Sequence, residues 1–83
     1  MSEPRWPLGQ QEIEVVLKEA DSVYEANPDH FESPGFNQPP GAYVTMATEY
    51  LGGDAPWHRI GMLAHAFKEA EEREIEERKQ EEV

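Results

Sequence analysis

The chain has 83 residues, of which 18 are acidic and seven are basic, so its formal net charge is −11 at pH 7. It contains no cysteine, which excludes disulfides and thiolate metal sites, and it lacks the roughly 18-residue apolar run of a membrane helix. The acidity argues against direct binding to nucleic acid or an anionic membrane, both of which need a basic surface. With no signal-peptide pattern at the N-terminus, we expect a single small domain, residues 1–83, in the cytoplasm.

Residues 1–9 contain two prolines and a glycine and predict an irregular arm, whose Trp6 we expect to pack against the helices. Residues 10–26 predict an amphipathic helix, because apolar residues recur there at spacings of three and four. Asn27-Pro28 ends the pattern. The apolar stripe consists of Ile13, Val16, Leu17, Ala20, Val23 and Tyr24.

Residues 27–41 contain four prolines and two glycines, which excludes a regular helix or a central strand. A connection this long in a small domain is usually functional or disordered. Two interpretations of its aromatic residues remain open. Phe31 and Phe36 either fill gaps between helices or anchor a partner protein.

Residues 42–51 fit either a short helix or a strand. The apolar residues follow a helical stripe, whereas the β-branched Val44, Thr45 and Thr48 favour a strand. A single strand would have nothing to pair with, so we predict a short helix that ends at Gly52.

Residues 55–80 predict the longest helix, with Asp54 as its N-cap and Pro56 in its first turn. Its apolar stripe ends at Ala70, and residues 69–83 hold eight glutamates against three basic residues. A helix of this length is about 37 Å long, at ~1.5 Å per residue, and exceeds the roughly 30 Å diameter expected for the domain. We therefore expect it to overhang the body. The stripe consists of Trp57, Ile60, Leu63, Ala64, Phe67 and Ala70.

Together these elements predict an all-α fold, a small three-helix domain with a Glu-rich C-terminal helical extension. Two long amphipathic helices pack antiparallel with the short helix between them, and the Pro-rich loop lies across them. In the Glu-rich extension we expect two stabilising ion pairs, Glu69–Arg73 and Glu74–Arg78. The predicted core consists of Ile13, Val16, Leu17, Ala20, Tyr24, Tyr43, Met46, Tyr50, Ile60, Leu63 and Phe67.

The sequence contains no pattern that indicates a metal site, a cofactor or an enzyme. His58 and His65 are seven residues apart, about 10 Å along a helix, and cannot bind the same ion. Asp54–His58 and His65–Glu69 each supply only two ligands, and we expect simple pairs there. No Gly-rich phosphate loop, nucleophile elbow or Cys/His pairing is present. We predict a non-enzymatic protein with no cofactor.

The acidic extension indicates binding to another protein. Glu69, Glu72 and Glu76 lie on one side of the predicted helix, and its turns repeat every ~5.4 Å, near the phosphate spacing of a nucleic-acid strand. This pattern favours an inhibitor that blocks a basic, nucleic-acid-binding surface. The composition is typical of small accessory proteins of bacteriophages and mobile elements. However, three basic residues interrupt the negative face, and this interruption favours the alternative that the segment is simply a solvated helix.

The alternative is a homo-oligomer, either a structural or assembly protein or one that binds a small anionic ligand between subunits. In this interpretation Arg59 and Trp57 hold an anionic or planar ligand. The predicted pocket is lined by Tyr43, Tyr50, Trp57, His58 and Arg59.

Overall fold

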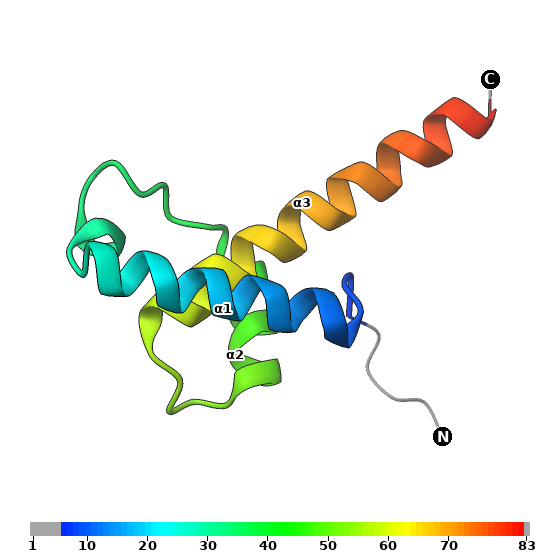
Figure 1. The fold of residues 1–83 in the computed structure, drawn as a ribbon. Helices are drawn as coiled ribbons and strands as arrows, with labels where there is room; N and C mark the ends of the chain where they lie inside the picture. Colours follow the sequence, from blue (N-terminus) through cyan, green and yellow to red (C-terminus); the bar gives the residue numbers. More distant parts are fainter. Residues whose placement is uncertain (1–5, 83) are drawn as a thin grey trace.

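The computed structural model describes the backbone of residues 6–82 and the side chains of residues 6–76. Three α-helices are present there: α1 (Gln10–Ala26), α2 (Gly41–Leu51) and α3 (Trp57–Glu82) (Figure 1). A single 3-10 turn, η1 (His30–Glu32), lies in the connection between α1 and α2. The predicted all-helical fold is confirmed. The strand alternative for residues 42–51 is wrong, since that segment lies in α2.

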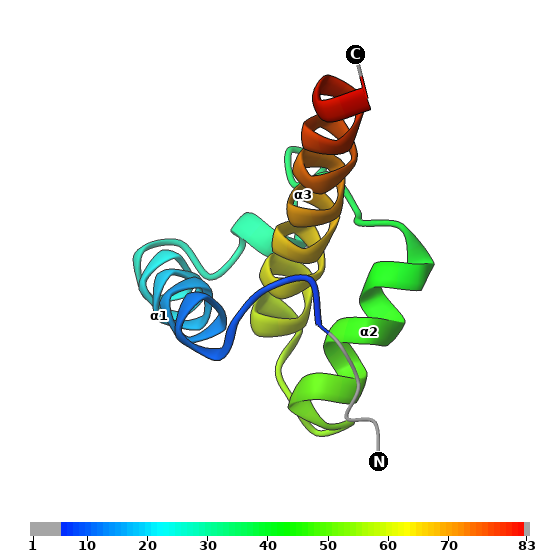
Figure 2. The ribbon, with the colours of Figure 1, turned by 90° about the vertical axis from the view of Figure 1, so that its right-hand side faces the viewer.

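Helix α3 is the central element of the domain. Helices α1 and α2 both pack on it and, within the described residues, make no close backbone contact with each other. Figure 2 shows them on opposite sides of α3, and Figure 1 shows α1 and α3 crossing in opposite directions. The short helix therefore does not lie between the two long ones. The apolar stripe of α3 is wide enough to bury against both neighbours.

The core forms where the two neighbouring helices meet the apolar half of α3. Ile13 of α1 and Leu63 and Phe67 of α3 have the largest fully buried side chains. Of the predicted core, five residues are buried: Ile13, Ala20, Ile60, Leu63 and Phe67. Five more are half-buried and pack against them: Val16, Leu17, Tyr43, Met46 and Tyr50.

Tyr24 was predicted in the core, and this prediction is wrong because it is 43% exposed. Its ring stacks on the imidazole of His58, with ring centroids 4.2 Å apart and an interplanar angle of 10°. The stack covers one face of the phenol ring at the C-terminal end of α1 and leaves the rest in solvent.

The N-terminal arm packs against the helices through Trp6, as predicted. The Trp6 ring stacks on Phe67 of α3 at 5.9 Å and meets Tyr50 of α2 edge-on at 5.4 Å. Leu8 is also buried. Since α1 and α2 make no close backbone contact with each other, the arm adds a link between α2, α3 and the start of α1.

The connection between α2 and α3 shows how the sequence determines where α2 ends and where α3 begins. Gly52 ends α2 with φ 96°, a conformation that favours glycine. The carbonyl of Pro56 accepts the amides of Arg59 and Ile60, so Pro56, not Asp54, is the N-cap residue. The reason is that Ala55 precedes a proline and is disfavoured in the helical conformation.

Helix α3 overhangs the body of the domain, as predicted from its length. Its 26 residues span about 39 Å at ~1.5 Å per residue, while the whole molecule measures 44 × 33 × 22 Å. Ala70 is the last buried residue among its described side chains, and all residues from Glu72 to Glu76 are exposed. Figure 1 shows the C-terminal half projecting beyond the other helices. Among the described residues, no helix is both long and apolar enough to cross a bilayer.

Candidate functional site

The most distinctive exposed surface is one side of the projecting half of α3. Glu69, Glu72 and Glu76, which we call the acidic face, are all exposed. Their spacing of three and four residues places them together on the side of α3 away from the buried Ile60 and Phe67. The structure thus brings the three predicted acidic residues onto one surface.

Ion pairing along the acidic face differs from the predicted pattern. Lys68 Nζ lies 3.3 Å from Glu72 Oε1, an exposed pair one helical turn apart. Among the described side chains, Arg73 forms no ion pair with Glu69, so this predicted pair is not observed. The predicted Glu74–Arg78 pair lies outside the described residues, because the Arg78 side chain is not among them.

The core-facing side of α3 also becomes acidic after Ala70. Glu71 and Glu74 follow Phe67 at spacings of four and seven, the positions that would continue the buried stripe. Ile75 is exposed and stands alone. The projecting half therefore has no apolar seam for a second helix.

Tyr43 of α2 contacts this acidic segment. Its hydroxyl donates a hydrogen bond to Glu71 Oε1 at 3.2 Å. Partial desolvation of the phenol, together with the negative charge and hydrogen bond of Glu71, raises the pKa of Tyr43. The contact fixes α2 to the point where α3 leaves the body.

A charged cluster joins the C-terminal part of α1 to the start of α3. Arg59 donates two hydrogen bonds to the Asp21 carboxylate, from Nε to Oδ1 at 2.9 Å and from Nη2 to Oδ2 at 2.6 Å. His58 Nε2 lies 2.8 Å from the same Oδ1. The hydrogen bonds from Arg59, and then from His58, hold the pKa of Asp21 well below its usual range, and Asp21 in turn raises the pKa of Arg59.

This cluster engages residues that the sequence assigned to an intersubunit ligand pocket. Arg59 and His58 both contact Asp21, and Trp57 Nε1 donates to the Phe31 carbonyl at 3.3 Å. Tyr50 packs on the arm, and Tyr43 binds Glu71. Within one chain the five side chains make separate contacts. Their side chains hold the fold together.

Sequence reasoning missed Asp21, although a signal was present. It lies four residues after Leu17 and three before Tyr24, so it shares the edge of the apolar stripe of α1. A carboxylate at the edge of buried surface needs a hydrogen-bonding or cationic partner. The partner, 38 residues along the chain, is not visible in the local pattern.

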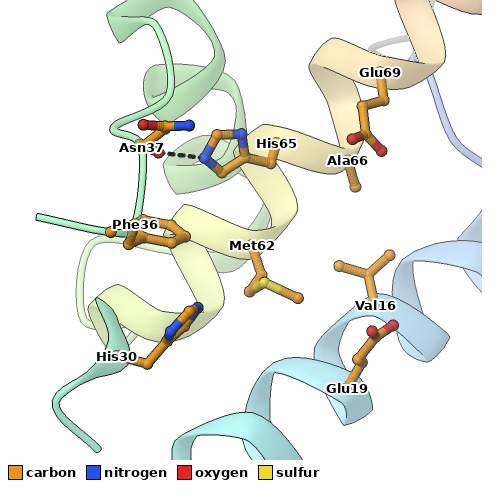
Figure 3. A pocket seen from close by; sticks show the side chains of 10 residues that line it. Val16, Glu19, His30, Phe36, Asn37, Met62, His65, Ala66 and Glu69 are labelled. Atoms are coloured by element: carbon orange, nitrogen blue, oxygen red, sulfur yellow. Dashed lines mark hydrogen bonds between the residues drawn. The ribbon is translucent and has the colours of Figure 1, made fainter. Parts of the chain in front are cut away.

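A groove lies between the Pro-rich loop, α1 and α3 (Figure 3). On one side is a row of three rings, with Phe36 meeting His30 at 5.9 Å and His65 at 5.2 Å. Val16 and Glu19 of α1 form the other side. The base is made by Met62 and Ala66, with Glu69 at the end nearest the projecting helix. The groove has a volume of about 370 Å³.

The loop side of this groove is fixed by its own contacts. His65 Nε2 hydrogen-bonds the carbonyl of Asn37 at 2.5 Å. Phe31 and Phe36 are only 2% and 8% exposed and pack edge-to-face at 5.2 Å. The gap-filling interpretation of these two phenylalanines fits this burial. The interpretation in which the two rings anchor a partner stays a prediction, and the Phe36 ring forms part of the groove wall.

The histidines have other partners than those expected. His58 contacts Asp21 rather than Asp54, and His65 contacts the loop carbonyl rather than Glu69. Among the described residues, no three His, Asp or Glu side chains are grouped so that they could hold a metal ion.

No protein-family model, curated protein or solved structure matches this chain.

Proposed function

We propose that this is a non-enzymatic binding protein whose acidic face docks on a basic surface of another protein. The favoured target is a surface that otherwise binds nucleic acid, which the protein would block. The observation that carries the proposal is the projection of α3, with its exposed glutamates, beyond the body of the domain.

The core of the described residues does not extend into the projecting half of α3. Among the described side chains, Ala70 is the last buried residue of the helix. Beyond it, residues 71–76 carry four glutamates against a single arginine and add no apolar surface except the exposed Ile75. A segment that contributes little to the core and presents mainly negative charge to solvent, interrupted by the exposed Arg73, is well placed to contact a partner.

The electrostatics of the acidic face also support a basic partner. Glu72 lies three residues from Glu69 and four from Glu76, and like charges at these spacings destabilise a helix by about 0.2–0.5 kcal/mol per pair. Cationic side chains from a partner would relieve this repulsion. The exposed Lys68–Glu72 pair competes only weakly, since such pairs contribute about 0.3–0.5 kcal/mol.

The charge and contacts of α3 support the alternative, a homo-oligomer with a ligand between subunits, less well. An acidic segment repels its own copy, and the stripe that would form a helical seam is occupied by Glu71 and Glu74. Arg59, the intended anion ligand, is already bound on two nitrogens by Asp21.

The test compares two triple variants that remove the same charge from different surfaces. One is E69Q/E72Q/E76Q on the acidic face. The control is E12Q/E14Q/E25Q on α1, where all three glutamates are also exposed. Each immobilised protein is used for affinity capture, the captured partner is purified, and its binding is then measured at low and high salt.

The proposal predicts a basic partner that the wild type and the α1 variant bind equally and the acidic-face variant loses. Binding should weaken as salt rises, because the contacts are exposed ion pairs. A nucleic-acid duplex or single strand that binds the partner should also displace the protein. Retained binding by the acidic-face variant would contradict the proposal, and lack of competition would remove its blocking part.

A further inference from the structure

We infer that the partner presents a linear basic segment with one bulky apolar side chain, which enters the groove of Figure 3 while the basic residues lie along the acidic face. This inference rests on the proposed function. It adds the chemistry of the recognised segment and a second contact site.

The groove has the character of a pocket for one side chain. Its base and sides expose apolar atoms of Val16, Phe36, Met62 and Ala66. Its volume of about 370 Å³ is at the lower end of the roughly 300–1,000 Å³ of small-molecule sites. It is also open along its length. A single leucine-sized or aromatic side chain suits it better than a whole cofactor.

The groove is preformed rather than a gap between mobile parts. A methyl group on Gly61 would lie 3.0 Å from Phe36 Cζ, so the glycine lets the phenylalanine ring pack directly on the α3 backbone. His65 ties the loop to α3 through the Asn37 carbonyl. A partner side chain therefore enters without ordering the loop first, which lowers the entropic cost of binding.

The negative charge at the margin of the groove favours basic residues on either side of the partner's apolar side chain. Glu19 on α1 and Glu69 on α3 stand at the margin of the groove, and neither forms an ion pair with another described residue. No lysine or arginine lines the groove. Anionic ligands are disfavoured there, and so is a second copy of this chain, whose net charge is −11.

The groove and the acidic face form one continuous surface. Glu69 closes the groove and is also the first residue of the acidic face. Glu76 lies seven residues further on, about 10 Å along the helix. An extended peptide at ~3.3 Å per residue covers this distance in about three residues. The recognised segment thus has several basic residues close to its apolar residue in sequence.

The test uses two fluorescein-labelled heptapeptides of equal charge, Lys-Lys-Leu-Lys-Lys-Lys-Lys and the same peptide with Ser in place of Leu. Binding is measured by fluorescence anisotropy at low salt. Partial burial of the leucine predicts at least about fivefold tighter binding than for the serine peptide. The variant Ala66→Gln, which places a polar side chain in the groove, should abolish this difference and leave serine-peptide binding unchanged.

A second measurement needs no groove variant. The chain has three methionines, so its methionine methyl signals are easily resolved by NMR. Met62 lines the groove, whereas Met46 lies in α2 and serves as the internal control. Met62→Leu assigns the signal. The leucine peptide should shift the Met62 methyl strongly and Met46 little, and the serine peptide should shift neither.

The outcomes separate this inference from the proposed function. Equal binding of both peptides, or a leucine advantage without a Met62 shift, would overturn the groove assignment but leave acidic-face binding intact. Binding of neither peptide would overturn both. A Met62 shift that appears on raising the concentration of the protein alone would identify a second copy as the occupant and also overturn it.

Discussion

Replacing Asp21 with asparagine tests the contact that joins α1 to α3. The substitution keeps the shape of the side chain and removes its charge. It therefore weakens two hydrogen bonds from Arg59 and one contact with His58, all between 2.6 and 2.9 Å. The cluster is one of few polar links between these helices in the described structure.

The expected loss of stability follows from exposure. The side chains of Asp21 and Arg59 are each 40% exposed, so solvent screens the ion pair. Its contribution to stability therefore lies within the roughly 0–1 kcal/mol of surface pairs. We expect a value near the top of this range because the pair is bidentate. His58 is 11% exposed and loses its charged partner, which adds up to about 1 kcal/mol. We predict a total of about 1–2 kcal/mol. At ~4–8 °C per kcal/mol, Tm falls by about 5–15 °C.

The effect of pH has a definite sign. The folded-state pKa of Asp21 lies below its unfolded value of about 3.9. The contribution of the cluster is therefore complete above about pH 4 and is lost as the pH falls through the folded-state value. Wild type and Asp21→Asn should differ at pH 7 and converge in strong acid.

Thermal and urea unfolding of a double-mutant cycle measure this coupling. The cycle consists of Asp21→Asn, Arg59→Gln and the double variant, and we expect a coupling of at least about 0.5 kcal/mol. Asp54→Asn is the matched control, since Asp54 is exposed and does not cap α3, and should change stability by less than about 0.5 kcal/mol. Additive single effects, or a difference that persists undiminished in strong acid, would refute the reasoning.

Three further predictions test the fold. Ile13→Ala should lower the free energy of unfolding, measured in urea, by about 2–4 kcal/mol. The control Val15→Ala, two residues away and 63% exposed, should change it by less than about 0.5 kcal/mol. Equal effects would contradict the orientation of α1. Trp6→Ala should lower the free energy of unfolding by about 2 kcal/mol through lost aromatic packing, and an unchanged Tm would show that the arm is not bound. Tyr43→Phe should remove an ultraviolet absorbance component that titrates above pH 10. Since folding raises the pKa of Tyr43, wild-type stability should fall as pH rises past about 10 more than that of the variant.

The sequence predicted the helices and their buried sides because those depend on local periodicity. The stripe containing Ile13 identified the buried side of α1, and the length of the predicted α3 helix predicted the overhang. The stripes did not reveal which helices pack together. Periodicity shows which side of a helix is buried but not against what, so the position of α2 beyond α3 was missed.

The candidate site was only half predictable for the same reason. Glu69, Glu72 and Glu76 share a side of one helix, so their common surface follows from spacing alone. The groove brings together a loop and two helices. Its loop residues have no periodicity that would predict burial, and the Asp21–Arg59 contact spans 38 residues.

The most direct test of the acidic-face account is an amide NMR titration of the ¹⁵N-labelled protein with an octalysine peptide at low salt. The account predicts that the largest shifts lie between Glu69 and Glu76, disappear in E69Q/E72Q/E76Q and diminish as salt is added. Shifts spread evenly over all exposed acidic residues, or centred on the glutamates of α1, would contradict it.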